Sequence, residues 1–253
     1  MTATASTLKF EPTRKRVRIL LGGELVADTT DAMLVWEVPY YPAYYIPASD
    51  VRADLVPAES AAAEIKHVAG LGTPEVLTVK VTAAAAEGGA RRYPDAAVSE
   101  LRDFVRFEWG AMSEWLEEDE PVYVHPRNPY SRVDILASSR HVRVEVDGVT
   151  VADSRSPRIL FETGLPPRYY LPLTDVRMDL LRSSDTHTSC PYKGTAAYWS
   201  VQTPTRTHKD VVWIYRTPLP ESQKIAGLAC FYNERVEIYV DGERLERPRT
   251  PFS

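Results

Sequence analysis

The chain of 253 residues lacks features that several common classes of protein require. It contains only two cysteines, Cys190 and Cys230, which cannot form a disulfide framework. No apolar run approaches the roughly 20 residues needed to cross a membrane, and the N-terminus lacks the charged start and apolar block of a signal peptide. We therefore expect a cytoplasmic protein with reduced thiols and no membrane partner.

The sequence also has no excess of basic charge. Its 30 Lys and Arg residues are outnumbered by 35 Asp and Glu residues, which gives a formal net charge of −5. A nucleic-acid-binding protein needs a concentrated basic surface to neutralise phosphates, so we expect no nucleic-acid partner. The GxGxxG and Walker loops of nucleotide-binding proteins are missing, as are the GxSxG and HExxH motifs of hydrolases. The sequence therefore predicts no cofactor.

What the sequence does contain is an internal repeat. Val142–Leu180 aligns without a gap on Val17–Leu55, and sixteen aligned positions carry the same residue, where average composition would give about two or three matches. A repeat of this length predicts a duplicated domain. We expect a flexible tail at 1–15, a first domain over 16–136, a short joint at 137–141, a second domain over 142–245 and a C-terminal tail at 246–253.

Strand and turn signals dominate both copies. Alternating apolar residues flank Gly22-Gly23 in the first copy and Asp147-Gly148 in the second, a pattern typical of β-hairpins with two-residue turns. Residues 112–120 are interpreted as a helical turn. The predicted fold class is mainly β, with two tandem domains and few short helices. Because the joint is short and contains no glycine or proline, we expect the domains to pack tightly.

Three segments of the second half resemble a known family: FETGLPPRYYLP, CPYKGTAAYWSV and AGLACFYNERVEIYVDG. With them, this half is similar to a complete copy of domain of unknown function 427. The first half, with VWEVPYYPAYYIPASDVRADL, resembles the degenerate leading copy of tandem members. The resemblance implies two β-tent domains, a fold similar to that of methionine sulfoxide reductase B and often built around zinc. It implies no chemistry. The first copy has no equivalent of CPYKG, so any site on that motif occurs once.

A zinc site is nevertheless not expected. A structural site needs four Cys or His ligands, and the chain offers only His187 and Cys190 at a suitable spacing. Cys190 is also a candidate nucleophile, because Lys193 could stabilise its thiolate. The alternative interpretation is a buried thiol beside a lysine that hydrogen-bonds loop carbonyls.

Two glutamates, Glu37 and Glu162, lie in the middle of apolar strands. An unpaired buried charge is costly, so each glutamate must be paired or have a raised pKa. We expect the partners to be hydroxyl groups of the Tyr-Tyr pairs or two arginines, Arg52 and Arg177. Because both copies carry the glutamate, a structural ion pair is the favoured interpretation and ligand binding is the alternative.

The segment VYVHPRNPYSRVD occurs only before the joint. In it, His125 offers an imidazole that titrates near neutrality, and Arg127 offers a forked cation for a carboxylate or enolate oxygen. Ligand sites often lie between domains, so we expect a pocket at or near the domain interface. The alternative is that Arg127 and Arg132 pair with the acidic residues at 117–120.

These residues favour a small metal- and cofactor-independent enzyme. It would use acid/base chemistry on a carbonyl-bearing small molecule, in an elimination, isomerisation or cyclisation. The alternatives are a non-catalytic small-molecule-binding module and a structural or interaction protein. The predicted catalytic residues are His125, Tyr44, Tyr169 and Lys193. The predicted substrate-binding residues are Arg127, Tyr130, Arg168, Trp199, Glu37 and Glu162.

Overall fold

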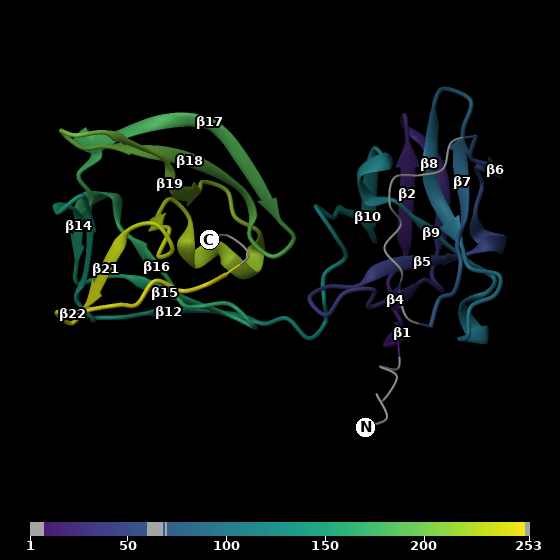
Figure 1. The fold of residues 1–253 in the computed structure, drawn as a ribbon, viewed down its shortest axis with the longest axis horizontal. Coiled ribbons are helices and arrows are strands. Elements are labelled where there is room, and N and C mark those ends of the chain that lie inside the picture. Colours follow the sequence, from purple (N-terminus) through teal and green to yellow (C-terminus); the bar gives the residue numbers. More distant parts are fainter. Residues whose placement is uncertain (1–7, 60–67, 69, 251–253) are drawn as a thin grey trace. The chain divides into compact units, whose positions relative to one another are not determined.

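The chain forms two compact units, residues 1–128 and 129–253, which we call the first and second domain. The computed structural model describes residues 8–59, 68 and 70–250. Each domain contains a seven-stranded and a four-stranded antiparallel sheet (Figure 1). Within the described residues, the helices are six short 3-10 helices. The predicted mainly β class with two tandem domains is therefore confirmed.

The first domain has a seven-stranded sheet in the order β1-β4-β5-β9-β8-β7-β6 and a four-stranded sheet in the order β11-β10-β2-β3. The strands of the larger sheet are β1 (Phe10–Pro12), β4 (Met33–Val35), β5 (Ala43–Pro47), β6 (Asp54–Pro57), β7 (Glu75–Lys80), β8 (Ala85–Arg92) and β9 (Phe104–Phe107). Those of the smaller sheet are β2 (Val17–Leu21), β3 (Glu24–Thr29), β10 (Glu114–Glu117) and β11 (Glu120–Pro121). The 3-10 helices are η1 (Ala48–Asp50), η2 (Ser99–Leu101) and η3 (Trp109–Ala111).

The second domain repeats this topology strand for strand, with the orders β12-β15-β16-β20-β19-β18-β17 and β14-β13-β21-β22. Its larger sheet contains β12 (Val133–Ala137), β15 (Arg158–Glu162), β16 (Arg168–Leu171), β17 (Leu181–Cys190), β18 (Gly194–Gln202), β19 (Thr207–Tyr215) and β20 (Ala229–Phe231). Its smaller sheet contains β13 (Val142–Val146), β14 (Val149–Ser154), β21 (Glu237–Val240) and β22 (Glu243–Arg244). The 3-10 helices are η4 (Leu173–Asp175), η5 (Met178–Leu180) and η6 (Pro220–Ile225).

The larger sheet of each domain carries a hydrophobic cluster on each of its faces. In the second domain one face packs on the smaller sheet through residues such as Tyr169, Leu171 and Phe231. The opposite face buries Tyr170 and Cys230 in a second cluster that includes Ile225 of η6. Successive side chains of a strand point to opposite faces, so the two tyrosines of the Tyr-Tyr pair enter different cores. The second of them reaches the face that carries the glutamate.

The domain boundary differs from the one that the repeat predicts. Strand β12 (133–137) pairs with β15 of the second domain, although the sequence places it at the end of the first. Its counterpart β1 (10–12) lies within the stretch expected to be a flexible tail, but it pairs with β4. These edge strands share little sequence, so the repeat visible by identity begins one strand too late in both copies.

Both predicted hairpins form, and their turns use left-handed backbone. Gly22 and Gly23 have φ values of 59° and 83°, and Asp147 and Gly148 have values of 50° and 73°. Two successive positive φ angles are the signature of a type I′ turn, which matches the twist of the flanking strands. Aspartate tolerates this conformation better than most residues with a side chain.

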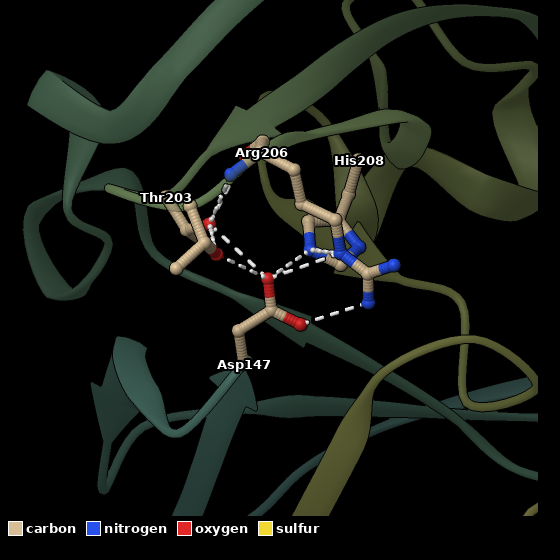
Figure 2. A network of polar contacts seen from close by, with 5 residues as sticks. Asp147, Thr203, Arg206 and His208 are labelled. Atoms are coloured by element: carbon tan, nitrogen blue, oxygen red, sulfur yellow. Dashed lines mark hydrogen bonds and ion pairs between the residues drawn. The ribbon is translucent and has the colours of Figure 1, made fainter.

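The aspartate of the second turn also connects the two sheets. Its carboxylate accepts hydrogen bonds from Arg206, in the turn between β18 and β19, and from His208, near the start of β19 (Figure 2). The shortest of these contacts joins His208 Nε2 and Asp147 Oδ2 at 2.7 Å. Thr203 and Thr205 also donate to Oδ2, at 3.2 and 3.1 Å. Hydrogen bonds from Arg206 and His208 hold the pKa of Asp147 well below its ordinary value of 3.8.

This network predicts an acid-dependent contribution to stability. A carboxyl group with a lowered pKa in the folded state stabilises that state above its unfolded pKa and loses the effect as the pH falls below it. We expect Asp147→Asn to lower the stability of the second domain by a constant amount above about pH 5, and by less at each step below about pH 4. Urea unfolding over this pH range measures the difference. The exposed Glu246→Gln is the control, and a pH-independent difference for Asp147→Asn would contradict the assignment.

Candidate functional site

The two glutamates expected to be buried lie at corresponding places, each on the face of the larger sheet that is turned away from the smaller one. In the first domain, Arg106 on β9 donates to both carboxylate oxygens of Glu37, at 3.0 and 3.2 Å. The hydroxyl group of Tyr45 donates to Oε1 at 2.9 Å. Arg106 also pairs with Glu108, which Arg91 contacts in turn. The carboxylate is thus held by a permanently charged guanidinium.

The second domain neutralises its glutamate with a different residue. Lys193, in the turn between β17 and β18, places Nζ 2.5 Å from Glu162 Oε2. Each side chain keeps only 11% of its exposure. The position that corresponds to Arg106 is occupied by Cys230, because Tyr45 pairs with Arg106 and Tyr170 pairs with Cys230 across the same two strands. The cation therefore comes from a turn instead of the neighbouring strand.

A thiol and a hydroxyl group complete this cluster. Burial alone would lower the pKa of Lys193, but interactions with Cys190 and Glu162 raise it, so the side chain stays an ammonium at neutral pH. Burial raises the pKa of Tyr215, and Cys190 and Glu162 add to the effect. We call Glu162, Cys190, Lys193 and Tyr215 the lysine cluster. It combines a cation, a carboxylate, a half-buried thiol and a neutral phenol.

The arginines expected to pair with the two glutamates do not do so. Arg52 instead contacts Asp28 at 3.3 Å, and Arg177 contacts Asp179 at 2.7 Å. Both arginines lie just after a 3-10 helix at the surface, where aspartates are nearer than the buried glutamates. The alternative prediction of a tyrosine hydroxyl holds for Glu37, whose Oε1 accepts from Tyr45.

The other predicted residues of the first domain lie in two groups. Tyr44 donates to Glu117 Oε1 at 2.5 Å, and burial raises the pKa of Tyr44. The positive charge of Arg127 acts on the same hydroxyl group. His125 stacks on Tyr41 with ring centroids 4.2 Å apart, and its Nδ1 lies 2.8 Å from the carbonyl oxygen of Pro126. Burial lowers the pKa of His125, which favours the neutral imidazole. Its acid/base role stays a prediction.

The remaining predicted residues belong to the second domain. The Arg168 guanidinium makes two hydrogen bonds to Glu234, at 2.7 and 2.6 Å. Tyr169 is buried between the sheets, and Tyr130 is 59% exposed. Trp199 packs against the same core, with Arg216 5.6 Å from its ring centroid. Of the predicted set, Lys193 and Glu162 form a direct pair with each other.

Two residues of the acidic run at 117–120 pair with basic residues from the start of the chain. Lys15 pairs with Glu117, and Arg18 pairs with Asp119. Arg132 pairs with Asp134 at 2.9 Å, so its predicted pairing with the acidic run is wrong. The sequence analysis did not identify Arg106 and Tyr215. Each lies in an apolar strand, and which residues it meets on the neighbouring strands depends on the order of strands in the sheet.

Two kinds of feature are missing from the part of the chain that the structure describes. No cluster of three or more His, Cys, Asp or Glu side chains within the described residues is arranged to hold a metal ion. Among the same residues, no helix has the length and apolar character needed to cross a membrane.

Comparison with known proteins identifies the family. A search of curated proteins returned no match. A family model described as a domain of unknown function (DUF427) matches residues 9–118 and, a second time, residues 134–242. The chain therefore belongs to the DUF427 family and carries two copies of its domain.

Proposed function

We propose that the lysine cluster of the second domain is an acid/base site for a carbonyl-bearing small molecule, operating with the chain's own side chains. The observation that carries the proposal is that the two copies use different cationic residues to pair with the glutamate. The first copy holds its glutamate with Arg106, and the second holds Glu162 with Lys193. A guanidinium does not release a proton in proteins, whereas an ammonium can donate one and binds an oxyanion as a compact charge.

The proposed reaction begins with the removal of a proton from the substrate. Glu162 accepts a proton from the carbon next to the carbonyl group. The electron pair of the broken C–H bond forms a C=C bond, and the carbonyl π pair moves to oxygen to give an enolate. The Lys193 ammonium and the Tyr215 hydroxyl group stabilise that negative charge. The proton on Glu162 is then replaced by one from solvent. Transfer of that proton to the same carbon gives isotope exchange, and in a β,γ-unsaturated substrate, whose enolate is conjugated, its transfer to the γ carbon gives isomerisation.

Proton exchange supplies an assay that works before the substrate is identified. The purified full chain is incubated in D2O with a panel of small ketones, aldehydes and 2-oxo acids, and loss of the C–H signals is followed by proton NMR. We expect catalysed exchange for at least one class. Glu162→Gln should reduce the rate by a factor of about 10² to 10⁴, and Lys193→Met by about 10² to 10³.

The controls separate chemistry from folding and from binding. Lys80→Met removes an exposed lysine of the first domain and should leave exchange unchanged. Lys193→Arg keeps the charge and should keep part of the rate if the cation only stabilises the enolate. A compound that raises the melting temperature without exchanging would favour the non-catalytic binding module. Exchange that persists in Glu162→Gln would refute the assigned base.

A further inference from the structure

A second feature of the second domain is an open depression on the sheet β17-β18-β19, separate from the lysine cluster. Its volume is about 480 Å³, which falls in the range of small-molecule sites. It is lined by Ser183, Ser184, Asp185, Thr186, Ser200 and Lys209. The lining contains hydroxyl groups and two charges, and no aromatic or aliphatic side chain.

Irregular strand pairing creates this depression. The register between β17 and β18 shifts between Ser183 and His187, and the register between β18 and β19 shifts between Trp199 and Val201. Two bulges in adjacent ladders therefore lie side by side. Asp210, at the same level of β19, has a φ of 52°, in the left-handed region that residues with a side chain rarely adopt. Bulges re-aim side chains and often accompany binding sites.

The hydroxyl groups of the depression are oriented by Asp210. Thr186 Oγ1 donates to Asp210 Oδ2 at 2.8 Å and accepts from Ser184 Oγ at 3.1 Å. The backbone N–H of Asp210 donates to Ser200 Oγ at 3.2 Å, which leaves the Ser200 hydroxyl proton as a donor. Asp210 Oδ1 is enclosed and makes no hydrogen bond with any described residue. Such an unsatisfied acceptor is rare unless a bound molecule or water completes the network.

Charge and polarity together select the ligand class. The two carboxylates, Asp185 and Asp210, are matched by two cations, because Lys209 lines the depression and both Lys209 and Arg235 act on the charge of Asp210. The site is therefore close to neutral, which disfavours phosphates and other anions. A sugar hydroxyl group donates and accepts at once, so it can accept the Ser200 proton and donate to Asp210 Oδ1. We propose that the depression binds a neutral polyol of monosaccharide size. This inference does not depend on the proposed acid/base function.

The test is an NMR titration of the full 15N-labelled chain with glucose, mannose, galactose and ribose, each to about 50 mM, because weak sugar sites have dissociation constants near the millimolar range. We expect at least one sugar to shift the amide signals of residues 183–186, 200 and 209. Ser200→Ala should weaken binding about fivefold to tenfold by removing one donor. Ser189→Ala, on the same strand outside the depression, should bind as the wild type does.

Three results would overturn the proposal. The first is the absence of any shift with all four sugars. The second is an equal response in Ser200→Ala. The third is a larger response of the same amides to inorganic phosphate than to any sugar, which would make the depression an anion site.

Discussion

Replacing Glu234 with leucine should destabilise the second domain by about 3 to 5 kcal/mol, because it leaves a buried guanidinium without its counter-charge. The side chains of Arg168 and Glu234 are 8% and 0% exposed. Burial would raise the pKa of Glu234, but the hydrogen bonds from Arg168 and Thr250 keep it lowered. Urea unfolding gives the size of the loss, and hydrogen exchange read by mass spectrometry assigns it to peptides of the second domain.

The double variant distinguishes a buried charge from general damage to the fold. Arg168→Met with Glu234→Leu replaces both charges by apolar groups, so most of the lost stability should return. Asp179→Asn removes an exposed partner of Arg177 and should cost less than about 1 kcal/mol. A double variant as unstable as Glu234→Leu alone would show that the pair itself, and not an uncompensated charge, carries the stability.

The second large effect on stability is expected from Arg106, because the two copies use different cationic residues to pair with the glutamate. Arg106→Cys places in the first domain the residue found at the corresponding position of the second. We expect a loss of about 3 kcal/mol, because Glu37 is only 15% exposed and no CPYKG turn is present to supply a lysine. Peptides of the first domain should lose protection from hydrogen exchange while those of the second keep theirs.

A second substitution should restore part of the stability that Arg106→Cys loses. Adding Glu37→Gln removes the uncompensated charge and keeps an acceptor for Tyr45, so part of the stability should return. Arg92→Cys breaks an exposed pair with Glu75 and serves as the matched control, with an expected cost below about 1 kcal/mol. An Arg106→Cys protein as stable as the wild type would mean that the carboxylate of Glu37 does not need the guanidinium.

Local sequence signals predicted the features that depend on adjacent residues. The hairpins at Gly22-Gly23 and Asp147-Gly148 follow from turn chemistry alone. The helical turn predicted at 112–120 is wrong, because this stretch forms β10 and β11 on the edge of β2. Trp115 and Glu117 are buried on alternate positions, but the second of them is charged, so the sequence shows no apolar alternation that would indicate a strand.

The site could be predicted only in part. That Glu162 needs a partner follows from its place in an apolar strand, but the choice of Lys193 depends on a turn 31 residues away in the sequence. The depression on β17-β18-β19 was not predicted, because its bulges arise from strand register and leave no residue pattern. Arg106 and Tyr215 act through neighbouring strands, which a single sequence does not order.

The pairing of β12 with β15 has a consequence for how the chain can be divided. All strands of the first domain's two sheets lie before the peptide bond between residues 128 and 129, and all strands of the second domain's two sheets lie after it. Cleavage there breaks no ladder, whereas cleavage at residue 141, where sequence identity begins, removes an edge strand from one half and leaves an unpaired one on the other. A domain that keeps its edge strands can be separated from the chain or fused to another protein without exposing an unpaired strand that would promote aggregation. Each structural domain therefore begins one strand before the stretch in which the two copies share their sequence.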